Sequence, residues 1–335
     1  MATYCLLPHP GVNAVFFDAS ARLSLAELSL CLPRLDVPGG NAREEEAAGL
    51  RWYCFDAEAP LGARDVARLA ALSSAYALFL REGELLRPVP LVWERPFGDD
   101  LSAILKYTGK TNALFTRLLL HIAELSLPDA PADRPLRLLD PVAGKGTTLF
   151  EALMRGWDAC GIEIVQKAAH EGAVYFQKYL ETGRWKHTLQ KEKAHGAPAW
   201  RFAFARDKDA LRRQPGRLTL IAGDARLADK YFGKGCFDVL AGDLPYGVAH
   251  GTLSGGSLTR TPAPLLSGAL PAWHAVLRPG GVLALSWNTL VYPVEAMRAM
   301  LADHGFSPCA GAPYDALSHR VDASIRRDIV VAVRN

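Results

Sequence analysis

The sequence predicts an α/β protein with a mainly parallel sheet, an antiparallel last strand and a small N-terminal α+β domain. From Leu136 onward, apolar runs alternate with segments of helical periodicity, which is typical of parallel strands joined by helices. The first run ends in Asp140 and leads into a turn with Gly144 and Gly146, as many ligand-binding α/β sheets begin. Glycine lets the backbone approach a ligand without a Cβ in the way.

The composition is that of an ordinary globular protein of two domains. The 335 residues are 50% hydrophobic and 22% charged, and no apolar run approaches the ~20 residues that cross a bilayer. The N-terminus lacks the positive start of a secretory signal. Six scattered cysteines without a C-x-x-C pair argue against a zinc site or a disulfide framework. We therefore expect reduced thiols, no metal, no membrane contact and a cytoplasmic location.

Residues 1–86 are predicted to form a ferredoxin-like domain with the order β-β-α-β-α-β. Turn signals at Pro38–Asn41 and an acidic patch at Glu44–Glu46 separate its two halves. We expect this domain to position a large substrate, because it contains no catalytic constellation. Its expected strands are Tyr4–Leu7, Asn13–Phe17, Leu50–Phe55 and Glu84–Pro88, and its expected helices are Leu23–Leu32 and Ala63–Leu80.

Residues 87–108 form a predicted linker that contains several prolines, and residues 109–335 form the predicted second domain. A helix is expected within Lys106–Ala123, with Leu114, Leu118 and Ile122 on its packed face. A hairpin of Phe306–Pro313 and Ile325–Val333 is expected to close the sheet, and the glycines of Gly247–Gly268 predict a mobile loop. The other expected strands are Leu136–Asp140, Asp158–Ile162, Leu218–Ile221, Phe237–Ala241 and Gly281–Trp287, and the helices are Thr147–Arg155, Val165–Leu180, Pro264–Val276 and Pro293–Asp303.

A long basic insert, residues 175–217, separates the second and third strands of this sheet. Residues 178–217 carry 11 Lys/Arg against 4 Asp/Glu, although the net charge of the whole chain is only +3. Aromatic residues lie among these charges, namely Tyr179, Trp185, Trp200 and Phe202. Basic and aromatic side chains together suit the phosphates and bases of a nucleic acid, whereas the plainer interpretation is a solvated face above packed rings.

The glycine turn does not fit two common phosphate-binding motifs. A phosphate loop needs four residues between its first glycine and the Gly-Lys-Ser/Thr, with no second glycine after the lysine. The three-glycine dinucleotide fingerprint fails as well, because Phe150 stands at or near its third position. The acids that follow the turn therefore decide the interpretation.

Three later features follow the turn in a recognisable order. They are Glu163 at the end of the second strand, Asp224 after the third, and Asp-Leu-Pro-Tyr (Asp243–Tyr246) after the fourth. This order resembles the class I S-adenosylmethionine methyltransferases, Rossmann-like enzymes that here would modify exocyclic amino groups. The resemblance covers about two-thirds of the chain, and the tetrapeptide is its specific part.

Within that class, the chain resembles the tRNA guanosine N2-methyltransferases, a family often joined to a THUMP domain. The motif D-P-x-x-G-x-G-T-x-x-x-E matches at Asp140–Glu151. Asp-Leu-Pro-Tyr mixes the two forms that the family often has, Asp-Pro-Pro-Tyr and Asn-Leu-Pro-Tyr. The N-terminal domain resembles the ferredoxin-like half that precedes THUMP, but the chain before the linker is too short for a complete THUMP domain. The resemblance implies methyl transfer to the N2 amino group of guanosine in RNA, with tRNA as the expected partner, bound by the basic insert and the N-terminal domain.

The resemblance also implies roles for particular residues. Glu163 would hold the ribose hydroxyls of S-adenosylmethionine, Asp224 the adenine amino group, and Asp140 and the glycine turn the methionine and ribose. The implied cofactor-binding residues are Asn112, Phe115, Asp140, Ala143, Gly144, Gly146, Thr147, Glu163, Ile164, Asp224, Ala225 and Asp243. The implied catalytic residues are Asp243, Leu244, Pro245 and Tyr246. From the residues alone, Asn112 is equally well a helix cap and Phe115 a core aromatic.

The tetrapeptide suits an amino group whose lone pair is conjugated with a purine ring. Asp243 and the Leu244 carbonyl can accept hydrogen bonds from the amino hydrogens and so move the nitrogen towards sp³ geometry, and Pro245 stiffens the turn. Tyr246 can stack on the base, which is worth ~1–3 kcal/mol towards the cost of extruding it.

Other functions remain open at this point. A DNA adenine-N6 methyltransferase shares the tetrapeptide, and a protein glutamine methyltransferase has a similar motif that the basic insert disfavours. A nicotinamide-dependent oxidoreductase and a non-catalytic RNA-binding protein are the alternatives from other classes.

Overall fold

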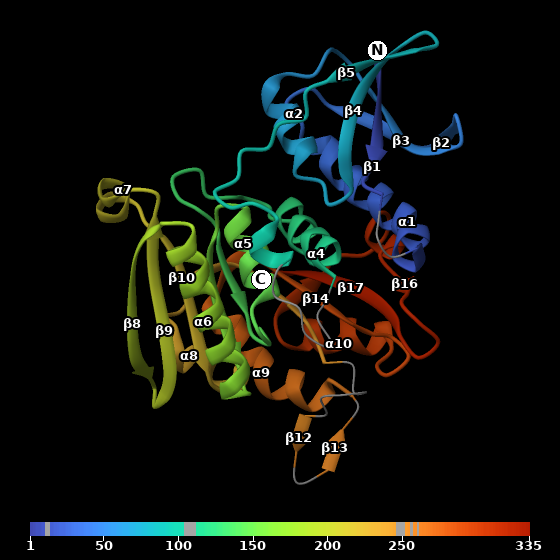
Figure 1. The fold of residues 1–335 in the computed structure, drawn as a ribbon. Coiled ribbons are helices and arrows are strands. Elements are labelled where there is room, and N and C mark those ends of the chain that lie inside the picture. Colours follow the sequence, from blue (N-terminus) through green and yellow to red (C-terminus); the bar gives the residue numbers. More distant parts are fainter. Residues whose placement is uncertain (11–13, 104–111, 246–251, 255–256, 260) are drawn as a thin grey trace. The chain divides into compact units, whose positions relative to one another are not determined.

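A computed structural model describes residues 1–10, 14–103, 112–245, 252–254, 257–259 and 261–335 (Figure 1). The chain forms two compact units, and each is described by itself. The first comprises Met1–Glu94 and Ala310–Ile329, and the second comprises Arg95–Cys309 and Val330–Asn335. The predicted domain limits of 1–86, 87–108 and 109–335 stay a prediction. The structure adds that the chain enters the first unit twice.

The first unit contains a five-stranded sheet of order β2-β3-β1-β4-β5, whose printed strand pairs are all antiparallel. Tyr4, Cys5 and Leu6 of β1 are all buried, so both faces of this central strand are packed. The elements are β1 (Ala2–Pro8), α1 (Ala14–Cys31), η1 (Leu32–Arg34), β2 (Gly39–Ala47), β3 (Leu50–Ala57), α2 (Ala63–Ala70), β4 (Ala75–Glu82), β5 (Leu85–Val89), η3 (Tyr314–Ala316) and β16 (His319–Arg320). The order β-α-β-β-α-β is ferredoxin-like, with β5 added at one edge.

The ferredoxin-like class is confirmed, but the predicted order of elements was wrong. The segment predicted as the strand Asn13–Phe17 lies in α1 from residue 14, and Asn13 falls outside the described residues. The predicted helix Ala63–Leu80 is the short helix α2 followed by the strand β4. The helix ends because the Ser73 N–H and hydroxyl both donate to the buried carboxylate of Glu27, at 2.9 Å and 2.6 Å.

The predicted turn and acidic patch are in fact the edge strand β2. Its acids are balanced by arginines, because Glu44 pairs with Arg51 at 2.8 Å and Glu45 pairs with Arg81 at 2.6 Å. A charged edge strand discourages pairing with other chains. Such a cross-strand balance cannot be read from the acidic run alone.

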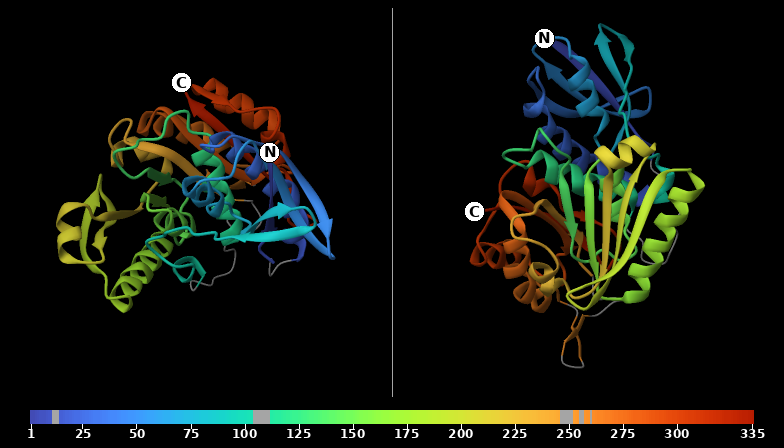
Figure 2. Two further views of the ribbon diagram at one scale, coloured as in Figure 1. Left: turned by 90° about the horizontal axis from the view of Figure 1, so that it is seen from above. Right: turned by 90° about the vertical axis from the view of Figure 1, so that its left-hand side faces the viewer.

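The second unit is built on a long sheet of order β15-β17-β14-β11-β6-β7-β10-β9-β8 (Figures 1 and 2). Its central strands are β6 (Arg137–Asp140), β7 (Asp158–Glu163), β10 (Gly216–Ala222), β11 (Phe237–Asp243) and β14 (Leu277–Asn288), and their printed pairings are parallel. In chain order these five strands run 3-2-1-4-5, the arrangement of doubly wound sheets. An antiparallel hairpin of β15 (Phe306–Pro308) and β17 (Arg326–Arg334) closes the sheet. The predicted Rossmann-like fold class is therefore confirmed.

Helices cover both faces of this sheet (Figure 2). Fully buried residues such as Leu240, Leu283, Trp273 and Trp287 form its main core. The helices are α3 (Asp100–Ala103), α4 (Ala113–Leu125), α5 (Thr147–Met154), α6 (Gln166–Thr182), α7 (Lys208–Arg213), α8 (Ala228–Tyr231), α9 (Ala263–Val276) and α10 (Val294–Asp303), with η2 (Ala225–Leu227). The predicted helices of this sheet match α5, α6, α9 and α10 closely. The predicted mobile loop includes residues outside the described ones, and its described parts include the small hairpin of β12 (Thr252–Ser254) and β13 (Ser257–Thr259).

The basic insert is a β-hairpin that widens the sheet. Strands β8 (Lys186–Ala194) and β9 (Ala197–Ala205) pair antiparallel with each other, and β9 pairs antiparallel with β10. Trp185, Trp200 and Phe202 are buried, and Phe176 of α6 contacts Phe202 edge-on. These rings pack in the core, so their predicted role as a base-stacking surface was wrong. Tyr179 is half-buried and donates its hydroxyl to Asp100 at 3.0 Å.

Candidate active site

Three carboxylates end neighbouring strands at one edge of the sheet. The strands β11, β6 and β7 are adjacent, and they end in Asp243, Asp140 and Glu163. Neighbouring strands lie about 4.8 Å apart. The strand order reverses between β6 and β11, and ligands of doubly wound sheets bind outside the carboxyl ends at such a point. This edge is therefore the candidate site.

The glycine turn between β6 and α5 has a backbone that side chains rarely permit. Gly144 has φ +54° and Gly146 has φ +99°, in the left-handed region that favours glycine. The Ala143 N–H donates to the Ile162 carbonyl at 2.9 Å, and the Gly146 N–H donates to the Ala143 carbonyl at 2.8 Å. Gly146 then begins α5 as its N-cap, and Thr147 is buried behind it. The turn is thus fastened to the end of β7.

Glu163 is held by two backbone amides. Its two carboxylate oxygens accept hydrogen bonds from the N–H groups of Gly144 and Val165, each at 2.8 Å. A carboxylate oxygen has two acceptor positions, so both oxygens can still receive a further donor such as a ribose hydroxyl. Ile164 lies next to it with 70% of its surface exposed, which is unusual for an isoleucine and leaves an apolar side chain free for a ligand.

Asp140 is buried at the centre of this edge. Its side chain accepts the Val142 N–H at 2.9 Å, and the residue is only 2% exposed. The pKa of Asp140 is raised to about 7, mainly by burial and in part by the nearby carboxylates of Glu163 and Asp243, against hydrogen bonds from Val142 and Thr148. The corner is therefore rich in negative charge and suits a ligand that carries positive charge.

Asp243 is oriented by the neighbouring strand β14. The register places Asp243 opposite Ser286, whose hydroxyl donates to the Asp243 carboxylate. The Leu244 N–H donates to the Ser286 carbonyl at 2.8 Å. Leu244 is buried and Pro245 is half-buried, whereas the predicted stacking residue Tyr246 lies outside the described residues. The structure thus fixes the first part of the Asp-Leu-Pro-Tyr turn.

Two further predicted residues follow β10. The Gly223 N–H donates to the Glu163 carbonyl at 3.0 Å, which brings the segment with Asp224 to the same edge. Asp224 caps η2 through the Arg226 N–H, and the Arg226 guanidinium beside it lowers the pKa of its carboxylate. The Ala225 carbonyl accepts the Trp273 indole N–H at 3.0 Å.

The predicted contacts Asn112 and Phe115 lie at the start of α4. The Asn112 side chain caps this helix by accepting the Leu114 N–H at 2.9 Å. Phe115 is fully buried. Both residues therefore do what the plainer interpretation of the sequence requires, and a cofactor contact by either stays a prediction.

Sequence analysis assigned no role to several residues that shape this edge. A Cβ on Gly172 of α6 would lie 2.7 Å from the Lys145 carbonyl oxygen, so this glycine lets the helix touch the turn. A Cβ on Gly242 of β11 would lie 3.0 Å from the Asp140 carboxylate. Glycines inside a helix or a strand are a weak sign of such close approach. Ser286 stands in an apolar strand, and a buried hydroxyl there signals a partner.

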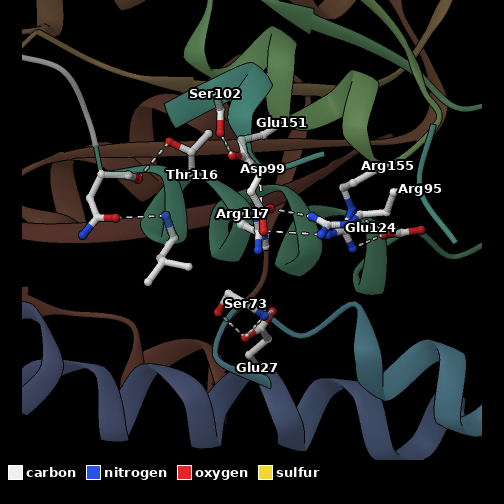
Figure 3. A network of polar contacts seen from close by, with 12 residues as sticks. Glu27, Ser73, Arg95, Asp99, Ser102, Thr116, Arg117, Glu124, Glu151 and Arg155 are labelled. Atoms are coloured by element: carbon white, nitrogen blue, oxygen red, sulfur yellow. Dashed lines mark hydrogen bonds and ion pairs between the residues drawn. The ribbon is translucent and has the colours of Figure 1, made fainter. Parts of the chain in front are cut away.

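Glu151, the last residue of the matched motif, anchors the segment before α4. It is 1% exposed and accepts hydrogen bonds from the Ser102 hydroxyl at 2.5 Å and from Arg117 at 3.2 Å (Figure 3). Arg117 also pairs with Asp99 at 2.7 Å, and Asp99 pairs with Arg95. These pairs lower the pKa of Asp99 to about 2, against the effect of its burial. This network connects α5 to α4 and to the segment that precedes it.

The basic residues of the insert are distributed over both edges of the sheet. The pairing of Ile221 with Ala199 and of Gly216 with Phe204 places the β8–β9 turn at the candidate-site edge and α7 at the opposite edge. Exposed Lys191 and Lys193 precede the turn. Most of the exposed basic residues lie towards the opposite edge, namely Arg184, Lys186, Arg206, Lys208, Arg212, Arg213 and Arg217.

Within the described parts of the chain, His, Cys, Asp and Glu form no group of three or more that could hold a metal ion. Among the described residues, the helices are too short or too polar to cross a membrane.

Comparisons with known proteins identify similar solved structures. No protein-family model matches this chain. No curated protein matches it either. The chain is similar to TrmN from Thermus thermophilus, with 17% identity over 100% of both chains and a TM-score of 0.47. It is also similar to the magnesium protoporphyrin IX methyltransferase ChlM from Synechocystis PCC 6803 with bound SAM, with 15% identity over 68% of this chain and 87% of that one and a TM-score of 0.40. A TehB-like SAM-dependent methyltransferase from Corynebacterium glutamicum has 13% identity, covers 62% and 83%, and has a TM-score of 0.38. Likenesses at this level do not identify a reaction or a substrate.

Proposed function

We propose that this chain is an S-adenosylmethionine-dependent methyltransferase that acts on the exocyclic N2 amino group of guanosine in RNA, with tRNA as the expected substrate. The single observation that carries the proposal is the meeting of Asp140, Glu163 and Asp243 around the glycine turn. The turn and Glu163 form a place for a nucleoside, and Asp243 opens the Asp-Leu-Pro-Tyr turn beside it.

The charge of this corner fits S-adenosylmethionine better than a nicotinamide dinucleotide. Burial raises the pKa of Asp140, and the negative charges of Glu163 and Asp243 act in the same direction. A dinucleotide would bring two phosphate charges to the same corner, and like charges repel at short range. The methionine part of S-adenosylmethionine instead brings a sulfonium and an ammonium group. The same residues as in the sequence-based prediction would hold it, with Glu163 on the ribose and Ile164 beside the adenine.

When bound, this cofactor supplies a methyl group activated by the positive charge on sulfur, so the protein needs to provide orientation rather than a metal. Asp243 and the Leu244 carbonyl accept hydrogen bonds from the target amino group and so free its lone pair. Pro245 has no N–H and a fixed φ, which keeps this backbone from turning. Tyr246 stacks on the extruded base.

The distribution of basic residues favours a macromolecular substrate. Pro198 of β9 is level with the candidate-site edge, and Arg206 follows the end of β9 eight positions later, which corresponds to about 26 Å of extended chain. A single nucleotide cannot reach both basic regions, whereas a folded RNA can contact phosphate-binding residues at both edges. We assign the remainder of the RNA contact to the N-terminal unit.

The direct test is transfer of a labelled methyl group from S-adenosylmethionine into bulk tRNA, followed by mass spectrometry of the nucleosides. Labelled N2-methylguanosine is expected with the natural protein and is expected to be lost in Asp243→Ala. Asp303→Ala is the matched control, because Asp303 is an exposed acid at the end of α10. Absence of label from every RNA contradicts the proposal.

Two parallel assays separate this function from its alternatives. Label in N6-methyladenine of duplex DNA would identify a DNA methyltransferase. A rise in melting temperature with a nicotinamide dinucleotide and none with S-adenosylmethionine would identify an oxidoreductase, because a ligand stabilises the folded state that binds it.

A further inference from the structure

We propose that Ser286 is a positioning residue that orients the Asp243 carboxylate and anchors the backbone before the Leu244 carbonyl for methyl transfer. This inference rests on the proposed function. It assigns to a strand residue outside the Asp-Leu-Pro-Tyr motif the task of directing that motif at the target amino group.

Ser286 contacts the corner through its side chain and its backbone. It lies on β14 directly opposite Asp243 of β11, and it is fully buried. Its hydroxyl donates to Oδ1 of Asp243, and its carbonyl accepts the Leu244 N–H at 2.8 Å. One residue thus holds the Asp243 carboxylate and the peptide group that immediately precedes the Leu244 carbonyl.

The hydroxyl matters because a carboxylate can rotate. A hydrogen bond from the Ser286 hydroxyl to Oδ1 holds the Asp243 carboxylate in one orientation. The backbone bond fixes the Asp243–Leu244 peptide. Gly242 lets β11 lie close to Asp140, because a Cβ there would be 3.0 Å from the Asp140 carboxylate. The backbone therefore sets the position of the Asp243 carboxylate, and the Ser286 hydroxyl sets its orientation.

The surroundings of Ser286 argue that this hydroxyl is present for Asp243. Its neighbours Leu283, Leu285 and Trp287 are almost fully buried, in a strand that packs into the main core. An apolar residue would suit such a strand, and a buried hydroxyl is tolerated only with a partner. Asp243 itself is half-buried, so water can replace the lost donor. Removal of the hydroxyl is therefore expected to affect orientation more than stability.

The test compares Ser286→Ala and Ser286→Thr in the full-length protein with labelled S-adenosylmethionine and tRNA. We expect Ser286→Ala to lower kcat about 10- to 100-fold, the range for a hydrogen bond to a charged group. The KM for tRNA and the melting temperature should change little, and Ser286→Thr should recover most of kcat because it keeps the donor. Thr219→Val is the matched control, since Thr219 is a buried hydroxyl on β10 of the same sheet, and its kcat should stay at the natural level.

A mutant cycle separates orientation from simple packing. In an Asp243→Asn background, Ser286→Ala should cost no more than a few-fold, because the hydroxyl then bonds a neutral amide oxygen instead of a charged carboxylate. An equal loss in both backgrounds, or an unchanged kcat in Ser286→Ala, overturns the inference and leaves the proposed function intact. If the natural protein labels no RNA at all, the proposed function falls, and the inference falls with it.

Discussion

The buried Asp140 makes cofactor affinity depend on pH in a direction that the structure determines. Burial raises the pKa of this carboxyl to about 7, so in the ligand-free protein it is mostly protonated at pH 6 and mostly ionised at pH 7.5. A cofactor with a sulfonium and an ammonium group favours the ionised form. Binding should therefore release a proton from Asp140 at pH 6, and affinity should rise with pH.

The size of the effect follows from the fraction of ionised Asp140. With a pKa of about 7, that fraction is about 0.09 at pH 6 and about 0.76 at pH 7.5. If only the ionised form binds, the apparent Kd is the intrinsic Kd divided by this fraction. S-Adenosylmethionine should then bind roughly eightfold more tightly at pH 7.5 than at pH 6.

Isothermal titration calorimetry measures both consequences. Titrations in buffers of different ionisation enthalpy should show release of nearly one proton at pH 6, and Asp140→Asn should remove the release and the pH dependence together. Equal affinity at both pH values, or uptake of a proton on binding, refutes the reasoning.

The stability of the ligand-free protein should change with pH in the opposite direction, because the folded state holds the Asp140 proton more tightly than the unfolded chain. The ligand-free protein should therefore lose up to about 4 kcal/mol of unfolding free energy as the pH rises from about 4 to about 7, and Asp140→Asn should lose less.

Three further substitutions test the cofactor site and the stability of the unit that contains it. Glu163→Gln should weaken S-adenosylmethionine about tenfold or more in the same titrations, because an amide can no longer accept from both the Gly144 and Val165 N–H groups; unchanged affinity would exclude Glu163 from the cofactor site. Gly172→Ala should cost about 1–3 kcal/mol in urea unfolding, because its Cβ would lie 2.7 Å from a backbone oxygen of the turn; an equally stable variant would show that α6 can shift. Asp238→Ala should cost about 3–5 kcal/mol, because the fully buried carboxylate pairs with two arginines, and the exposed Asp303→Ala should change stability by less than about 0.5 kcal/mol. Although burial raises the pKa of Asp238, its hydrogen bonds lower it overall, so its contribution should be present above its ordinary pKa and be lost as the pH falls through the folded value.

The parallel sheet could be predicted because its strands are short apolar runs bounded by turn residues. Asp140, Glu163 and Asp243 follow such runs directly, so their convergence at one edge is a consequence of parallel topology. The order 3-2-1-4-5, in contrast, depends on packing between helices and sheet that no local pattern records. Ser286 was missed for the same reason, because its partner is 43 residues away in the chain.

Two errors of the sequence-based prediction have identifiable causes. The apolar residues of Ala63–Leu80 fit helical spacing throughout, and the break comes from a distant carboxylate, Glu27, that captures the Ser73 N–H. In the insert, Trp200 and Phe202 alternate with Arg201 and Ala203, which is the period of a half-buried strand. The positive charge of the same segment favoured a nucleic-acid surface instead of a half-buried strand.

The double entry of the chain into the first unit has a consequence for dissecting the protein. The boundary at Ile329–Val330 falls inside strand β17, and residues 310–329 carry the Asp315 carbonyl to which Arg22 donates a hydrogen bond at 2.9 Å. Removal of residues 1–94 alone would therefore leave residues 310–329 in the protein without the rest of their unit. The Cys309 N–H donates to the Val331 carbonyl at 2.8 Å across the β15–β17 hairpin, so the two cut ends are already neighbours. An Asn-Gly turn that joins Cys309 to Val330, on a chain that starts at Arg95, would remove the first unit at both junctions; it would shorten β17 by residues 326–329 and keep its pairing with β15.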